Sequence, residues 1–205
     1  MTNRTDSFDR ADTTNAIGAA SDGLGSWTQD IGTWGIASNL GYKSASNNAV
    51  EFASLESSSS NMEVQATITG AGAALYGGIN ARVSGSANLL FVEMLVNGAS
   101  GYLKLYKRVA SVNTQIGSTY TGTLANGDVI KLRCDSANLL TAYQNGVSRV
   151  SATDSAGSTN TRHGLYVYSA VYRFNDFSIT DIAAGGAFIY KPSLIVSQAV
   201  KAGVW

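Results

Sequence analysis

The sequence predicts an all-β fold in which two antiparallel sheets pack as a jelly-roll sandwich. Apolar runs of strand length alternate along the chain with segments rich in Gly, Asn and Ser, and about a dozen short strands with no convincing helix indicate this architecture. The composition agrees, since 22 of the 205 residues are glycine and one is proline. A chain of this length buries a sizeable core and is most simply one domain.

The stretch 88–149 has the clearest strand pattern and is expected to form an antiparallel meander. Asn-Gly pairs such as Asn145-Gly146 favour the positive φ of tight turns. Leu103 and Leu105 fall on the opposite side of their strand from Tyr102 and Tyr106, which predicts one apolar and one solvated face. The expected strands of this stretch are 89–96, 102–109, 129–134 and 139–144.

The flanking segments supply further strands. Residues 62–69 alternate strictly between apolar and polar side chains, which predicts a half-buried strand. Trp27 and Trp34 stand between glycines and are expected to cover the edge of the sandwich core. The remaining expected strands are 8–11, 49–55, 76–83, 165–171 and 174–179.

Charge and the chain start limit the partners. With 14 basic and 14 acidic residues and no basic cluster, neither nucleic acid nor an anionic membrane is expected as a partner. Residues 1–6 are polar, and no window has the apolar length of a membrane span. We therefore expect no classical signal peptide.

Single reactive residues give no sign of catalysis. Cys134 is the only cysteine and lies in an apolar run, so it is expected to be a core residue. His163 is the only histidine, and a turn residue is a better interpretation than a catalytic base. No zinc spacing, phosphate-binding glycine loop or EF-hand loop is present.

The last segment, 182–205, differs from the rest. It begins with a hinge-like run that includes Gly185-Gly186 and is too apolar for a free tail, so we expect it to dock on a partner or a symmetry mate. The expected domains are thus a jelly roll at 1–181 and a C-terminal extension at 182–205. The predicted docking residues are Phe188, Ile189, Tyr190, Leu194, Ile195, Val196 and Trp205.

The order of motifs resembles that of concanavalin A-like, laminin-G-like jelly-roll domains over about residues 6–181. The opening run from Asp6 to Asp12, the Gly-Thr-Trp-Gly-Ile strand around Trp34 and the closing 173–179 strand carry this resemblance. The family occurs in glycan-binding modules, in glycosidases and in bacteriophage virions. Its glucanase branch has a Glu-x-Asp-x-x-Glu cluster, which is missing here: the four glutamates are scattered, so no enzyme is expected.

Calcium is the one metal that the resemblance suggests. The first and last strands of such domains tend to lie close, so that Asp9 (or Asp6) would approach Asp176 and share an oxygen-ligated ion. The favoured alternative is that Asp9 and Arg10 form ion pairs with Arg173 and Asp176. No other cofactor is expected.

Two functions follow from these patterns. The leading hypothesis is a non-enzymatic virion structural protein, a capsid decoration or tail-associated domain that is anchored to other virion proteins through its extension. It would be made in the host cytoplasm and lie on the capsid or tail surface of the virion. The alternative is an adhesion module that binds a host-surface glycan. The candidate glycan or interface aromatics lie in pairs on two strands, as cross-strand packing or a binding face would require: Tyr102, Tyr106, Tyr166 and Tyr168.

Overall fold

The computed structural model describes residues 3–45, 49–69, 75–96, 98–169 and 172–182. All regular elements in this part are strands, so it holds no helix of the length and apolarity that crossing a membrane requires. The predicted docking residues, from Phe188 to Trp205, lie outside the described residues.

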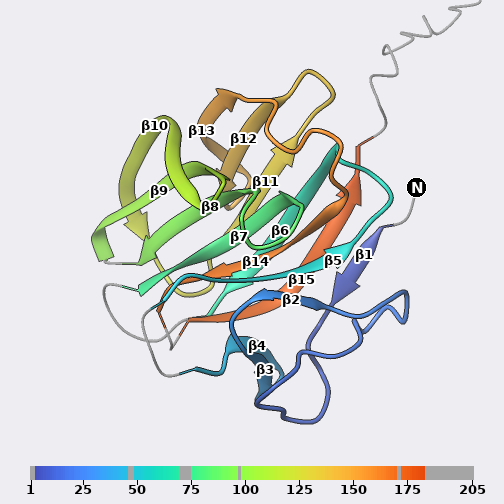
Figure 1. Ribbon diagram of the computed structural model, residues 1–205. Coiled ribbons are helices and arrows are strands. Elements are labelled where there is room, and N and C mark those ends of the chain that lie inside the picture. The colour runs from blue at the N-terminus through green and yellow to red at the C-terminus, as the bar shows by residue number, and fades with distance from the viewer. Residues whose placement is uncertain (1–2, 46–48, 70–74, 97, 170–171, 183–205) are drawn as a thin grey trace, which may run out of the picture.

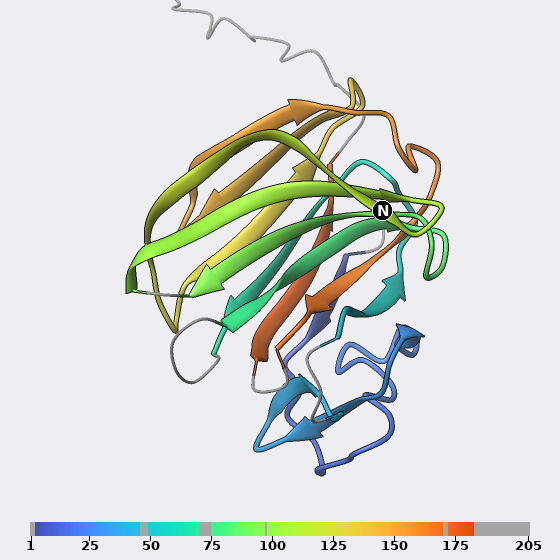
Figure 2. The ribbon, with the colours of Figure 1, turned by 60° about the vertical axis from the view of Figure 1, so that its left-hand side comes forward.

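Two antiparallel sheets form a sandwich, which confirms the predicted fold class. Figures 1 and 2 show the seven-stranded sheet, whose strands β7 to β9 are green, stacked on the yellow-to-orange strands β11 to β13 of the other sheet. The seven-stranded sheet runs in the order β10 (Val112–Leu124), β9 (Gly98–Val109), β8 (Leu89–Val96), β7 (Leu75–Val83), β14 (Arg162–Val167), β5 (Glu51–Glu56) and β2 (Thr28–Ile31). The eight-stranded sheet runs in the order β13 (Val147–Thr153), β12 (Leu139–Gln144), β11 (Val129–Cys134), β6 (Met62–Ile68), β15 (Arg173–Asp181), β4 (Leu40–Lys43) and β3 (Trp34–Ala37), with β1 (Arg4–Asp6) paired to β15.

Local sequence explains the best-formed elements. Strand β6 alternates between buried and half-buried residues along its whole length, as its apolar-polar alternation predicts. The turn between β12 and β13 is Asn145-Gly146, where both residues have positive φ, 50° and 78°. This is the backbone of a type I′ turn, and it fixes the register of the hairpin.

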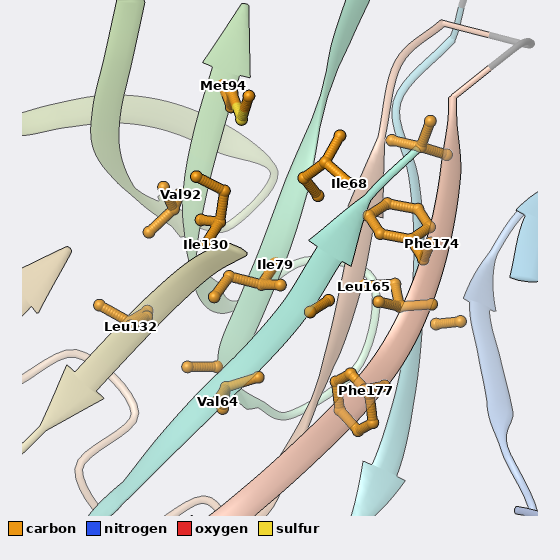
Figure 3. Packing of buried hydrophobic residues seen from close by; sticks show 14 of the residues in the cluster. Val64, Ile68, Ile79, Val92, Met94, Ile130, Leu132, Leu165, Phe174 and Phe177 are labelled. Carbon is orange, nitrogen blue, oxygen red and sulfur yellow. The ribbon is translucent and has the colours of Figure 1, made fainter. Parts of the chain in front are cut away.

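The core lies between the two sheets. Figure 3 shows side chains from both sheets converging, including Ile79 and Val92 from the seven-stranded sheet and Val64 and Phe174 from the eight-stranded one. All four are fully buried. Cys134 belongs to this cluster, and burial raises its pKa to about 12, so it is the core thiol that the sequence predicts.

Several sequence-based expectations were wrong. Residues 8–11 do not form a strand: the first strand of the described residues is β1, and Phe8 just after it has a positive φ of 56°. The stretch 88–149 is not one meander, because the chain leaves the seven-stranded sheet after β10 and forms β11 and β12 in the other sheet. Strands β10 and β13 were not predicted, since their mostly polar residues give no apolar run. His163 is not a turn residue but lies buried in β14, where its Nδ1 accepts a hydrogen bond from the Arg82 amide at 3.0 Å.

A further correction concerns the outer face of the seven-stranded sheet. The side of this sheet that carries Tyr102 and Tyr106 was expected to be solvated, but it has an apolar cluster of its own. Phe52, Phe91 and Tyr166 are each at most 2 % exposed within it, and Tyr106 packs on them. This sheet is therefore buried on one face and half-buried on the other.

Candidate functional site

The candidate site lies on that outer face, where four adjacent strands meet. The order β9-β8-β7-β14 puts residues far apart in sequence into one row across the strands, and the register places Tyr166 beside Gly78 and Gly78 beside Glu93. Gly78 stands between them, and across it the Tyr166 hydroxyl reaches the Glu93 carboxylate.

Glu93 is held by two phenols. The Tyr102 hydroxyl donates to Oε1 at 2.8 Å, and the Tyr166 hydroxyl donates to Oε2 at 2.6 Å. Burial, reinforced by the negative charge of Glu93, raises the pKa of Tyr102 and Tyr166 well above the usual value for tyrosine. Both phenols therefore stay protonated donors, and hydrogen bonds to a carboxylate of this kind are among the stronger ones in proteins.

An open hollow of about 340 Å³ lies above the carboxylate, lined by Tyr76, Glu93 and Tyr168. The rings of Tyr76 and Tyr168 meet edge to face, with centroids 5.8 Å apart and an interplanar angle of 80°. The Tyr102 ring lies 6.3 Å from that of Tyr76. Tyr168 is 36 % exposed, so the hollow presents aromatic surface to solvent next to a carboxylate.

Lys104 is the cation nearest in register, because it stands directly opposite Glu93 on β9. Its ammonium nevertheless lies over the Tyr102 ring, 4.1 Å from the centroid. Of the ion pairs among the described residues, none includes Glu93. Within the described ranges, the carboxylate of the hollow thus has hydrogen-bond donors but no counter-ion in direct contact.

The walls of the hollow are fixed from behind. The Tyr76 amide donates to the Ser169 hydroxyl at 2.9 Å, which ties β7 to the end of β14. Lys43, fully buried, pairs with Glu51 at 3.3 Å and donates to the Tyr168 carbonyl at 3.4 Å. The backbone that carries Tyr168 is therefore held by an ion pair between the sheets.

The structure gathers most of the predicted aromatic residues. Tyr102 and Tyr166 meet on Glu93, and Tyr168 lies at the hollow beside Tyr76. Tyr106 has a structural position instead, because its ring stacks on Phe91 at 5.0 Å. Whether these residues bind a glycan or form an interface stays a prediction.

Sequence reasoning missed the residue at the centre of the site, Glu93. The signal was present, since Glu93 is the single charged residue in the apolar run of β8. A lone acid in a strand that is otherwise apolar marks a polar group whose burial needs partners. Tyr76 is not among the four predicted aromatic residues, and its place in the hollow depends on the pairing of β7 with β14.

The predicted calcium residues lie elsewhere. Asp9 is exposed, while Asp176 lines a separate hollow of about 230 Å³ together with Asp6. The Asp6 carboxylate accepts hydrogen bonds from Trp27 at 2.7 Å and from both terminal nitrogens of Arg10 at 2.7 and 3.0 Å. Arg10 therefore pairs with Asp6, not with the last strand as the alternative proposed. In the described part of the chain, no group of three or more His, Cys, Asp or Glu side chains could hold a metal ion. Calcium binding by Asp9 and Asp176 stays a prediction.

The chain is similar to known proteins in its fold but not in its sequence. No family model and no curated protein sequence matches the chain. The carbohydrate-binding module CBM66 from Bacillus subtilis has a TM-score of 0.62 and 18% identity, over 76% of this chain and 95% of that one. A β-glucanase from Bacillus licheniformis has a TM-score of 0.54 and 10% identity, over 89% of this chain and 99% of that one. The carbohydrate recognition domain of Emp46p, in a metal-free form, has a TM-score of 0.53 and 11% identity, over 76% and 87%.

These likenesses support the two-sheet jelly-roll fold that the sequence motifs indicate. At such low identity they carry no functional residue from one chain to another.

Proposed function

We propose that this protein is a non-catalytic carbohydrate-binding domain whose ligand occupies the hollow of Tyr76, Glu93 and Tyr168. The observation that carries the proposal is the combination, in one open hollow, of aromatic rings with a carboxylate held in place by two phenols. The similar structures named as a carbohydrate-binding module and a carbohydrate recognition domain support it.

The geometry suits a sugar for a physical reason. A pyranose or furanose ring has apolar C–H faces, which pack on aromatic rings, and hydroxyl edges, which need hydrogen-bond acceptors. Tyr168 offers exposed ring surface, and Glu93 offers its remaining lone pairs. Because Lys43 and Ser169 already fix the backbone around Tyr168 and Tyr76, little ordering is needed on binding.

Hydrolysis has less support than binding. Retaining glycosidases need two carboxylates about 5 Å apart, and inverting enzymes need a pair at larger separation. Of the described residues that line the hollow, Glu93 is the one acid, and the other two are tyrosines. The β-glucanase likeness is therefore taken as a likeness of fold.

The virion role proposed from the sequence rests on the segment 182–205, most of which lies outside the described residues. It stays a prediction, as do the virion location and the virion partners. A chain that ends at Asp181, the last residue of β15, would test it: loss of incorporation into particles with an unchanged melting temperature would support an anchoring extension. Normal incorporation would contradict it.

Binding is tested on a glycan array with three forms of the protein. We expect the native chain to bind a limited set of glycans and Tyr168→Ala to weaken that binding at least about tenfold, since it removes the exposed ring. Tyr143→Ala is the matched control, because Tyr143 lies on the outer face of the other sheet beside Lys131. If no glycan binds, or if Tyr143→Ala weakens binding as much as Tyr168→Ala, the proposal is wrong.

A further inference from the structure

The charge of Glu93 is unusual for its place. It is half-buried on the sheet, and among the described residues its partners are the neutral hydroxyls of Tyr102 and Tyr166. These phenols supply hydrogen bonds but no positive charge. A carboxylate that has lost part of its hydration and has no counter-ion attracts a cation strongly.

Lys104, the described cation directly opposite Glu93, forms no direct ion pair with it. The register places Lys104 directly opposite Glu93, where an ion pair would be easy to form. Its ammonium instead lies over the Tyr102 ring. The aromatic surface around Glu93 thus already attracts one cation, while the carboxylate stays open towards the hollow.

The surrounding rings favour the same kind of ligand. Tyr76 and Tyr168 line the hollow with Glu93, and the Tyr102 ring stands 6.3 Å from that of Tyr76. Faces of aromatic rings around a carboxylate attract an ammonium group more than a neutral one, because the ring quadrupole and the carboxylate charge act in the same direction.

We infer that the ligand of this hollow carries a protonated amine, and that in a carbohydrate this amine belongs to an amino sugar. The ammonium would lie against the open side of the Glu93 carboxylate, with the sugar ring on Tyr168. This inference rests on the proposed carbohydrate-binding function and adds the class of sugar.

A neutral sugar would gain less at this position. Each oxygen of Glu93 accepts one phenol hydrogen bond and keeps a lone pair, so a sugar hydroxyl would add a third neutral donor and leave the negative charge uncompensated. A charged N–H donor forms a hydrogen bond about twice as strong, and it also removes the unpaired charge. We therefore expect the amine, not the hydroxyl pattern, to decide selectivity.

The experiment compares three β-1,4-linked oligosaccharides of equal length: glucosamine, N-acetylglucosamine and glucose. They differ in one substituent, which is an ammonium, a neutral amide or a hydroxyl. By titration calorimetry at slightly acidic pH and low salt, we expect the glucosamine oligomer to bind the native chain at least about tenfold more tightly than the other two. Tetramethylammonium, a cation without a sugar, is expected to compete with it.

The variants separate the site from general charge effects. Glu93→Gln keeps the shape and an acceptor oxygen but removes the charge, so it should abolish the preference for the glucosamine oligomer. Glu63→Gln removes the same charge from the other outer face, where Glu63 pairs with Lys131 and Arg133, and should leave the preference unchanged. If Glu93→Gln does not fold, Tyr168→Leu tests the site in its place, because it keeps Glu93 and removes an exposed ring.

Each outcome decides between the two proposals. Equal binding of the three oligomers, weakened by Tyr168→Leu, would leave the carbohydrate-binding function standing and overturn the amine. Suppose that tetramethylammonium alone binds, that its binding depends on Glu93, and that no oligomer or array glycan binds. This result would support a cation site and overturn the proposed carbohydrate-binding function. Failure of both probes to bind would overturn the inference, and the glycan array would then judge the proposed function by itself.

Discussion

The two outer faces of the sandwich treat a glutamate in opposite ways. On the eight-stranded sheet, Glu63 accepts from Lys131 at 3.0 Å and from Arg133 at 3.2 Å. On the seven-stranded sheet, Glu93 accepts from Tyr102 and Tyr166 and forms no ion pair within the described residues. One face neutralises its acid with its own cations, and the other only holds its acid in position.

The difference teaches how a sheet surface becomes a site. Exposed pairs such as Glu63–Arg133 contribute on the order of 1 kcal/mol or less and leave a surface with little net attraction. Neutral donors around Glu93 fix the carboxylate without cancelling its charge. The seven-stranded sheet therefore keeps an unbalanced group that a ligand can satisfy, and its aromatic cluster gives that group a firm base.

The largest effect is expected from the glycine beneath the site. A Cβ at Gly78 would lie 2.0 Å from the Val92 carbonyl oxygen, which is backbone and cannot turn away. Gly78→Ala should lower the free energy of unfolding by about 3 kcal/mol or more, measured by urea titration. Gln65→Ala, at a half-buried position on the other sheet, is the control and should change it by less than about 1 kcal/mol. Equal losses of stability from Gly78→Ala and Gln65→Ala would contradict this difference between the two faces.

Acid is expected to destabilise the fold through His163, which limits the pH range in which the two faces can be compared. Burial lowers the pKa of His163 to about 4, and its Nδ1 already accepts the Arg82 amide hydrogen. The unfolded chain binds a proton below the ordinary pKa of 6.5, whereas the folded chain does not until about pH 4. The contribution of neutral His163 to the free energy of unfolding is therefore fully present above pH 6.5. It is lost, by about 3 kcal/mol, as the pH drops towards 4.

Melting curves at several pH values check this prediction. His163→Gln should flatten the part of the curve between the two pKa values, because glutamine does not titrate. A native chain whose melting temperature stays constant through that interval would contradict the assignment of His163 as a buried neutral residue.

A smaller effect is expected from the phenols. Tyr166→Phe removes a donor from Glu93 in a buried place and should cost about 1 to 3 kcal/mol of stability. Tyr143→Phe, whose ring lies near Lys131 on the half-exposed other face, should cost less than about 0.5 kcal/mol. Similar losses from both variants would mean that the carboxylate of Glu93 is not held as described.

Chelation is expected to have the smallest effect. Asp6 is committed to Arg10 and Trp27, and Asp176 is exposed, so their region is held together without an ion. The melting temperature with EDTA should equal that with added calcium. A rise with calcium, abolished by Asp176→Asn, would instead establish the calcium site that the sequence predicts.

Local patterns predicted the strands far better than their partners. The alternation of β6 and the Asn145-Gly146 turn depend on neighbouring residues, and both were predicted correctly. Strand β10 was not predicted because it is an edge strand with mostly exposed side chains, and such a strand needs no apolar run. The move from β10 to the other sheet depends on packing between distant strands, and no local pattern encodes that packing.

The site shows the same division. Tyr102, Tyr166 and Tyr168 could be proposed from their spacing on strands, because side chains two residues apart share a face. Their gathering around Glu93 could not, since it requires β14 to pair with β7 and β7 to pair with β8. Residue types predicted the components, and the long-range register assembled them.

The insertion of β14 between β7 and β5 has a consequence for how the chain folds. Tyr76, Glu93 and Tyr102 lie on three consecutive antiparallel strands that pair with short loop closure, whereas Tyr166 and Tyr168 arrive from a strand about seventy residues later. Non-local pairing of this kind is slow. The hollow therefore cannot exist before β14 has docked on β7, and ligand binding would report that this non-local pairing has formed.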